Sequence, residues 1–535
     1  MLNVEHRLSR CRKSSLPGQQ PHPFDSSLST PIALCPTPLQ IQVIIQTRRI
    51  PVLPAELWRV IFRFATEDDT PIKFPAKTTG TDEISFLHFP HSHSDMDVRL
   101  EYYLGSIKKK RDLMRVCRQW SIIALEILYE CIWIYKPAQA HMLAEALSCK
   151  MDSDAGKIHD PQRGHYIKHL HIETHTRERC SPDDVRIIVN NTPCLEIYMD
   201  YRSVRRSMYA SSSMDPTSPV QLFDAIIHPN SSIRHLSWTN YDDMSFHLSL
   251  SPLLTSIASK LEFLELTFCN MDIHNLKEPL RGNPGPPLTL PHLCALKICL
   301  HDATLAVLTT WHLPVIKNVS VVAADFSYAG EGFCNFFRTH GEKLKQLELA
   351  HSSSIIEDHY LTIPVNPPTA TLRNVHLAAW CPILEEFICS ADAEWNWQNP
   401  DWIAPHAFLL SHPNLQLIGI RDLDKRIYDE IPITRTNPFC LLLSQIESLF
   451  RHGSFPKLLF VRDMSFESKT MRMEAHLESI VDFWSQVMRF CKDGGVWLED
   501  CTGMNITPMD IMRAQLKAMM RKKAQKELKE PQKQR

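Results

Sequence analysis

Glycine is scarce in this sequence, with 15 among 535 residues. Neither Gly-x-Gly-x-x-Gly nor Gly-x4-Gly-Lys-Ser/Thr occurs, so the phosphate-binding loops of nucleotide-binding α/β folds are missing. The catalytic patterns Gly-x-Ser-x-Gly and His-Glu-x-x-His are missing as well. We therefore predict a non-catalytic protein without a cofactor or metal site. An enzyme on an ordinary α/β fold is the weaker alternative.

An excess of one charge is also lacking, because 58 Lys and Arg residues nearly balance 60 Asp and Glu residues. Such a balance gives no overall attraction to nucleic acid or to an acidic membrane. The longest apolar run, from Ser121 to Tyr135, contains Glu126 and Glu130 and is shorter than the roughly 20 residues of a membrane-spanning helix. We expect no nucleic-acid partner, no membrane partner, and a cytoplasmic or nuclear location.

A disulfide framework is not indicated. The 16 cysteines are scattered and none forms a Cys-x-x-Cys pair, which favours reduced cysteines in the core. Residues 1–49 are rich in Pro, Ser and Gln and lack sustained periodicity, which is typical of a disordered tail. A mitochondrial presequence is the alternative for Met1 to Leu16, because this stretch carries four basic residues beside one acid.

A helix is predicted directly after Leu53-Pro54, because proline suits the first helical turn. Its apolar residues fall on two adjoining faces, one with spacing i, i+3, i+4, i+7 and one with spacing i, i+4: Leu57, Val60, Ile61 and Phe64, then Trp58 and Phe62. One face can pack on the chain's own helices, which leaves the other for a different chain. We expect Trp58 and Phe62 to stay uncovered and Leu57 to lie close to Trp120.

A polar stretch with several prolines interrupts this pattern from about residue 66 to residue 105 and predicts an inserted loop. The helical spacing i, i+3, i+4, i+7 then returns, as one stripe, at Leu113, Val116, Cys117 and Trp120. A further apolar helix runs through Leu128-Tyr129, and residues 131–135 predict a strand.

These segments resemble the F-box motif: Leu53-Pro54-x-Glu56-Leu57-x3-Ile61-Phe62, then Leu113-x2-Val116-Cys117-Arg118-x-Trp120, then Leu128-Tyr129. The long insertion is similar to that of F-box-like proteins of mushroom-forming fungi. The resemblance covers roughly residues 51–135 and implies a three-helix domain that docks on the Skp-type adaptor of a cullin–RING ubiquitin ligase. The alternative is that these helices only cap the following domain.

The resemblance also implies which residues build or present the docking surface, without dividing contact residues from core residues. The predicted adaptor-binding set is Leu53, Pro54, Leu57, Trp58, Ile61, Phe62, Leu113, Val116, Cys117 and Trp120.

From about residue 158 the chain repeats the phrase apolar-x-x-apolar-x-apolar. The clearest copy, Leu261-x2-Leu264-x-Leu266-x2-Cys269-x-Met271, fits the leucine-rich-repeat consensus. Further copies begin at Ile167, Cys194, Ile233, Leu293, Ile316, Leu344, Leu372, Leu415 and Leu458. Helix-like segments such as Gly332 to His340 lie between them, so each unit is predicted to be a strand plus a helix. Ordinary strands of a conventional α/β domain are the alternative.

The predicted fold class is therefore α/β, with a short helical F-box-like domain followed by a leucine-rich-repeat-like solenoid. The expected organisation is a tail at 1–49, the F-box-like domain at 50–135, a substrate-binding repeat domain at 136–505 and a basic tail at 506–535.

Side chains between the last two apolar positions of each phrase should point away from the core, because strand side chains alternate. We call these positions the polar lane: His171, Ser237, Glu265, Lys297, Ser320, Glu348, His376 and Gly419. Its mixed charges favour a protein target over phosphate, with His171, Glu265, Lys297, Glu348 and His376 as the predicted target-binding residues. Together with the F-box resemblance, this predicts a substrate-recognition adaptor of a ubiquitin ligase; a repeat scaffold without a ligase is the alternative.

One cluster consists of residue types that can bind zinc: His169, His171 and His175, with His165 and Cys180 nearby. Exposed strand histidines are the preferred interpretation. Residues 513–535 hold nine Lys or Arg residues against two Glu, with Ile511, Met512, Leu516, Met519 and Met520 on one apolar side. An exposed basic helix is favoured over a nuclear-import patch or an acidic partner's binding site.

Overall fold

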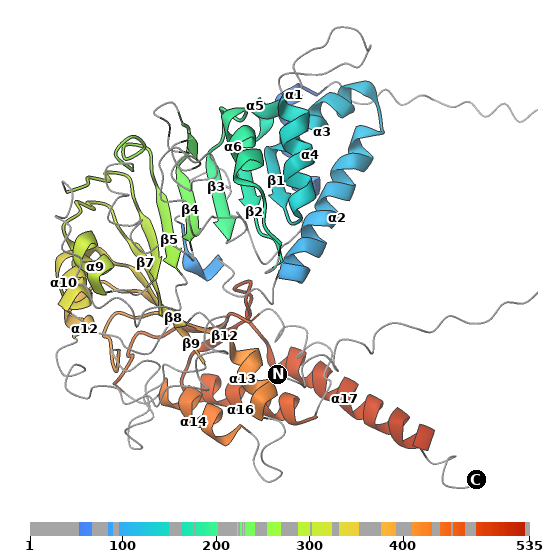
Figure 1. The fold of residues 1–535 in the computed structure, drawn as a ribbon. Coiled ribbons are helices and arrows are strands. Elements are labelled where there is room, and N and C mark those ends of the chain that lie inside the picture. The colour runs from blue at the N-terminus through green and yellow to red at the C-terminus, as the bar shows by residue number, and fades with distance from the viewer. Residues whose placement is uncertain are drawn as a thin grey trace, which may run out of the picture. The chain divides into compact units, whose positions relative to one another are not determined.

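The computed structural model describes the chain in segments, and the first 52 residues lie outside them (Figure 1). The described residues are 53–66, 84–88, 96–148, 163–175, 178–201, 222, 225–226, 228, 231–240, 254–268, 287–299, 302–323, 331–351, 376–391, 409–430, 439–450, 453–465 and 478–529. The predicted disordered tail at 1–49 is outside this set. Residues Pro54–Arg535 form one compact unit, to which everything below refers.

Three helices pack together at the start of this unit: α1 (Ala55–Thr66), α2 (Met96–Met114) and α3 (Arg118–Glu130). The predicted loop from 66 to 105 is wrong at its end, because α2 already begins at Met96 and a single 3-10 turn, η1, spans Phe86–His88. The predicted stripe from Leu113 to Trp120 is also broken, because α2 and α3 are separate helices and Cys117 caps the second one.

In the described part of the chain, twelve parallel strands follow, hydrogen-bonded in chain order from the first to the last. They are β1 (Cys131–Ile134), β2 (His169–Ile172), β3 (Ile197–Tyr201), β4 (His235–Asn240), β5 (Phe263–Phe268), β6 (Ala295–Cys299), β7 (Asn318–Ala323), β8 (Gln346–His351), β9 (Glu386–Ser390), β10 (Leu417–Arg421), β11 (Phe460–Asp463) and β12 (Trp497–Glu499). An α/β architecture with strands stacked in sequence order is thereby confirmed.

The repeated phrase predicts most of these strands correctly, since its last two apolar positions fall within β2, β4 to β8 and β10, and Val461 of the last copy falls within β11. The copy at Cys194 finds β3 but is one residue out of register, because Met199 pairs with His171 and Tyr198 pairs with the core residue Leu170. The copy at Leu372 is wrong: its described end, Leu377, begins a short helix, α12 (Leu377–Trp380). The strand of that unit is β9, where Leu384, Phe387 and Cys389 carry the same phrase and are fully buried. The last strand, β12, lies beyond the predicted copies.

Helices cover one face of the sheet (Figure 1). The larger of them are α4 (Pro137–Ser148), α6 (Pro182–Asn190), α9 (Asp302–Thr309), α10 (Glu331–His340), α13 (Leu423–Glu430), α14 (Cys440–Ser448) and α16 (Glu478–Asp493); the shorter elements are α5 (Arg163–Tyr166) and η4 (Gly341–Lys343). Their buried side chains and the apolar positions of the strands make one continuous core. Because each unit contributes one strand to the shared core, every unit is stabilised by its neighbours.

The described cysteines are free thiols, and Cys180, Cys381 and Cys389 are buried, as the absence of a disulfide pattern predicts. Among the described helices, no segment is both long and apolar enough to cross a membrane.

Candidate partner- and target-binding surfaces

The first helix has one covered and one uncovered apolar face. Trp58 and Phe62 are buried, and their ring centroids lie 4.9 Å and 4.8 Å from that of Trp120 on α3. The expectation that Trp58 and Phe62 stay uncovered is therefore wrong. These two residues belong to the core of the three-helix cluster, because Trp120 fills the space between them.

The other face of α1 is exposed, and we call it the open face: Leu57, Val60, Ile61 and Phe64 are 49%, 44%, 42% and 73% exposed. Four apolar side chains at helical spacing form one stripe, and a contiguous exposed stripe of this kind is typical of a contact surface. The sequence predicts two faces correctly but assigns the wrong one to the interior.

Two ion pairs fix which way α1 faces. The Arg59 guanidinium donates to both oxygens of Glu126, at 2.6 and 3.0 Å, and Arg63 donates to both oxygens of Glu130, at 3.0 and 2.9 Å. Both arginines are four residues apart on α1, and both glutamates are four residues apart on α3. This matched spacing is a signal in the sequence that would have identified the covered face.

Apart from Leu53, which precedes the compact unit, the remaining residues of the predicted adaptor-binding set lie in this cluster or directly before it in the sequence. Leu53, Leu113, Cys117 and Trp120 are partly buried, whereas Pro54 and Val116 are exposed. Ile122 of α3, which the motif does not include, is 63% exposed.

Seven of the eight polar-lane residues lie on one line of paired strand residues that runs across the sheet; His376 does not. Its strand residues, paired neighbour to neighbour, are Trp133, His171, Met199, Ser237, Glu265, Lys297, Ser320, Glu348, Ile388, Gly419, Arg462 and Glu499. Ile388 occupies the place predicted for His376, which instead precedes α12 and is exposed.

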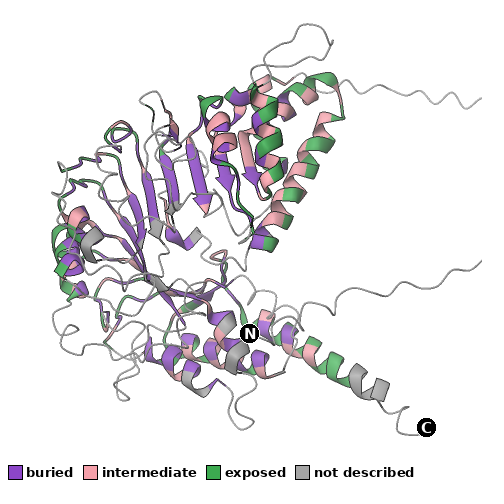
Figure 2. Cartoon of the chain, in the orientation of Figure 1, coloured by how far each residue is buried: buried purple, intermediate pink, exposed green. Residues whose placement is uncertain are grey.

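The lane is covered rather than open. His171, Glu265, Lys297 and Glu348 are all buried, and the strands are mostly purple in Figure 2. The expectation that these residues form an uncovered target-binding surface is therefore wrong. Charge reversal of Glu265 or Glu348 would place unpaired charge in the interior, so it cannot test target binding with the fold intact.

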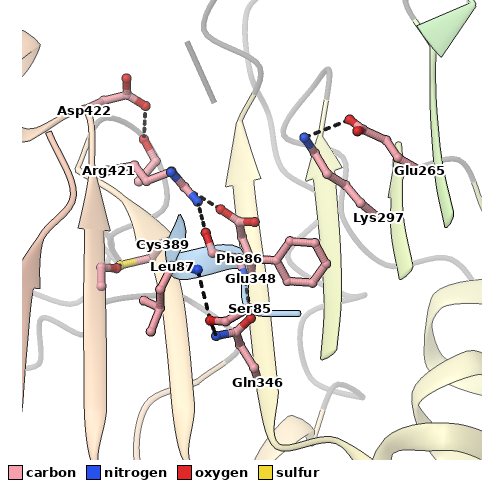
Figure 3. A network of polar contacts seen from close by, with 12 residues as sticks. Ser85, Phe86, Leu87, Glu265, Lys297, Gln346, Glu348, Cys389, Arg421 and Asp422 are labelled. Atoms are coloured by element: carbon pink, nitrogen blue, oxygen red, sulfur yellow. Dashed lines mark hydrogen bonds and ion pairs between the residues drawn. The ribbon is translucent and has the colours of Figure 1, made fainter. Parts of the chain in front are cut away.

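Buried ion pairs neutralise the lane's charges (Figure 3). Lys297 Nζ lies 2.8 Å from Glu265 Oε1, and the hydroxyl of Ser237 donates to Glu265 as well. Arg421 Nε, at the end of β10, donates to Glu348 Oε1 at 2.5 Å. Each charge has an opposite partner, which burial requires.

At the first strands the cover comes from α2. The guanidinium of Arg99 donates to both carboxylate oxygens of Glu173, each at 2.9 Å, and His171 Nε2 lies 2.9 Å from Glu173 Oε2. Burial alone would raise the pKa of Glu173, but Arg99 and His171 outweigh it and hold the pKa well below its ordinary value. Burial lowers the pKa of His171. The interpretation of this residue as an exposed strand histidine is wrong, and no cluster of metal-ligating residues occurs in the described part of the chain.

The segment Ile84–His88 covers the middle of the lane. Phe86 is fully buried, and with Leu87 it packs on a second apolar cluster that includes Met199, Phe263 and Ile388. Side chains of β7, β8 and β10 hold its backbone through hydrogen bonds described below (Figure 3). This part of the predicted insertion therefore forms one side of the second apolar cluster.

The basic C-terminal region is α17 (Pro508–Lys529). Ile511 is buried, whereas Met512, Leu516, Met519 and Met520 are exposed, so the predicted single apolar side is wrong with respect to Ile511. Gln515 donates to Ser485 on α16 at 3.0 Å, which fastens the first half of α17 to the repeat domain.

No family model matches the sequence, and no curated protein is significantly similar to it. The likeness to the F-box motif therefore depends on the residues of the sequence itself.

Proposed function

We propose that this protein is a non-catalytic substrate-recognition adaptor of a Skp–cullin–F-box ubiquitin ligase. In this proposal the cluster of α1, α2 and α3 binds the Skp-type adaptor, and the repeat sheet binds the target. Ubiquitin transfer belongs to other subunits, and this chain raises the target's effective concentration near the transfer machinery.

The observation that carries the proposal is the open face of α1. Its four apolar side chains lie on the helix that directly follows the F-box-like Leu53-Pro54. An apolar stripe left exposed on a folded domain favours association, because covering it removes apolar surface from water.

Rigidity of α1 supports the same function. Trp58 and Phe62 anchor its covered face on Trp120, and Arg59 and Arg63 are each held by two hydrogen bonds. A helix fixed in this way presents its open face without an ordering cost at the moment of binding.

The test is co-purification of the full chain with a purified Skp-type adaptor. We expect the wild-type chain to retain the adaptor and a variant with Ile61→Ser and Phe64→Ser to lose it. Met142→Ser is the matched control, because Met142 is also an exposed apolar residue, 59% exposed, but lies on α4. Retention by the double variant, or no retention by the wild type, contradicts the proposal.

A repeat scaffold without a ligase is the second candidate. The burial of Trp58 and Phe62 in the chain's own core favours it, because these two residues were expected to form the adaptor-binding face. In that case α1 to α3 would serve to cap the first strand of the sheet, and the adaptor would not co-purify with any form of the chain.

A further inference from the structure

The segment Ile84–His88 contacts the sheet as a bound peptide would (Figure 3). It lies more than two hundred residues from most of its partners in the sequence, as the separation of 260 between Phe86 and Gln346 illustrates. Phe86 is 0% exposed and Leu87 is 7% exposed. The two side chains thus fill neighbouring apolar positions on the face of the sheet that carries the polar lane, which we call the lane side.

Side chains of three strands hold the backbone of this segment. Phe86 N donates to Gln346 Oε1 at 2.7 Å, Arg421 Nη2 donates to the Phe86 carbonyl at 2.7 Å, and Asn318 Nδ2 donates to the Ile84 carbonyl at 2.5 Å. The three strand residues that make these hydrogen bonds, Gln346, Arg421 and Asn318, are all buried. Contacts to main-chain atoms give affinity for a peptide of any sequence, whereas side-chain positions select among peptides.

The sheet provides shaped positions for the two side chains. The Phe86 ring lies 6.4 Å from the Phe263 ring, centroid to centroid. The point where a Cβ would stand on Gly419 lies 2.6 Å from Met464 Sδ and 3.4 Å from Leu87 Cδ2. Glycine at this lane position therefore makes room for the methionine, and Leu87 lies beside it at van der Waals distance. Ile388 and Leu417 belong to the same apolar cluster.

Charged side chains beneath the segment are unusual for a sheet face that serves only as part of the hydrophobic core. Glu348 and Arg421 are buried as an ion pair, and the same guanidinium also reaches the Phe86 carbonyl. A buried ion pair is often no more stabilising than well-packed apolar residues of similar volume. A paired arginine that offers a further donor to a backbone carbonyl is suited to binding a peptide.

We propose that the lane side of β5 to β10 is a binding site for a short peptide and that Ser85-Phe86-Leu87 occupies it as an internal ligand. An external ligand of this site carries an aromatic residue followed by an aliphatic one, without charge at either position. It competes with the internal segment for Gln346 and Arg421. This inference deepens the proposed function, because the peptide would belong to the target, and it rests on that function for the target's role.

The experiment uses a fluorescent peptide of residues 82–90 as the probe and the full-length chain as the receptor. In an opened variant, Phe86→Ser with Leu87→Ser, we expect saturable binding measured by anisotropy. The wild-type chain should bind the probe at least about tenfold more weakly, because the tethered segment competes at an effective concentration on the order of millimolar.

Two matched controls define the site. The same peptide with Phe86→Ser and Leu87→Ser should not bind the opened variant. Adding Gln346→Leu to the opened variant should weaken binding of the original peptide about tenfold, because the buried N–H of the phenylalanine loses its acceptor. Equal binding of both peptides, or equal binding by the opened variant with and without Gln346→Leu, overturns the proposal.

Hydrogen exchange of the wild-type chain tests the proposal independently of whether the opened variant folds. An internal ligand leaves its site by local opening, so the amides of Ile84–His88 should exchange at least about a hundredfold faster than those of β7 and β8. Exchange at the same rate as these strands identifies the segment as permanent core and overturns the proposal. The adaptor is present in neither measurement, so failure of the ligase function leaves both results interpretable.

Discussion

The same substitution at two phenylalanines of α1, two residues apart, should change the stability of the three-helix cluster by very different amounts. Phe62 is 1% exposed, and its ring centroid lies 4.8 Å from that of Trp120 and 5.6 Å from that of Trp58. Phe64 lies on the open face and is 73% exposed. Because both residues have the same size and lie on the same helix, each is the control for the other.

Phe62→Ala removes a ring from a packed aromatic cluster and should destabilise the three-helix cluster by about 3–5 kcal/mol. Phe64→Ala removes a ring that is mostly in water already, so its effect on stability should stay within about 0.5 kcal/mol.

Amide hydrogen exchange of α1 and α3 is the suitable assay, because a chain of 535 residues does not unfold in a single two-state step. Phe62→Ala should accelerate exchange in both helices by about two to four orders of magnitude, roughly the factor that 3–5 kcal/mol implies. Equal acceleration by the two variants would refute the assignment of a covered face and an open face.

Three further perturbations follow from the buried charges. Arg99→Met should leave the Glu173 carboxylate buried without its guanidinium partner and destabilise the contact of α2 with the sheet by about 3–5 kcal/mol. Amide hydrogen exchange in α2 should then become faster, and an unchanged exchange rate in α2 contradicts this prediction. Glu265→Gln and Lys297→Met should each destabilise the chain by a few kcal/mol, but the double variant should cost less than the sum, as a double-mutant cycle measures; additive effects would mean no coupling. Burial and then Lys343 lower the pKa of His340 from 6.5 to about 4, so the unfolded chain takes up a proton below pH 6.5 before the folded chain does. The local stability of α10 should therefore fall by up to about 3 kcal/mol as the pH drops from 6.5 to 4, as measured by its amide exchange after correction for the intrinsic rates; His340→Gln should flatten this pH dependence, and an unchanged slope contradicts it.

Most strands were predictable because the same local rule acts in most units. Leucines at the phrase positions, such as Leu264 and Leu347, pack on the helices, and the residue between the last two apolar positions must face the other side. The copy predicted at Leu372 is wrong because two segments fit the phrase, and a regular spacing of the repeats favours Leu372 over Leu384-x2-Phe387-x-Cys389, which forms the strand.

Contacts between distant segments explain what the sequence could not predict. The polar character of Glu265 and Glu348 is local information and favours solvent, whereas their burial depends on partners elsewhere in the chain. Nothing in the sequence around Phe86 indicates that it docks on Gln346. For α1 both faces are apolar, so periodicity alone could not decide which one Trp120 covers.

Titration calorimetry of the purified Skp-type adaptor into the full chain tests the central claim most directly. The wild-type chain should bind one adaptor, and a variant with Leu57→Ser and Phe64→Ser should bind at least about a hundredfold more weakly, because truncating a hot-spot side chain costs about 2 kcal/mol or more and a total loss of about 2.7 kcal/mol already gives this factor. Unchanged exchange protection in α3 would verify that the variant keeps its fold. No binding by the wild-type chain, or equal affinity of the folded variant, would contradict the assignment of the open face to the adaptor.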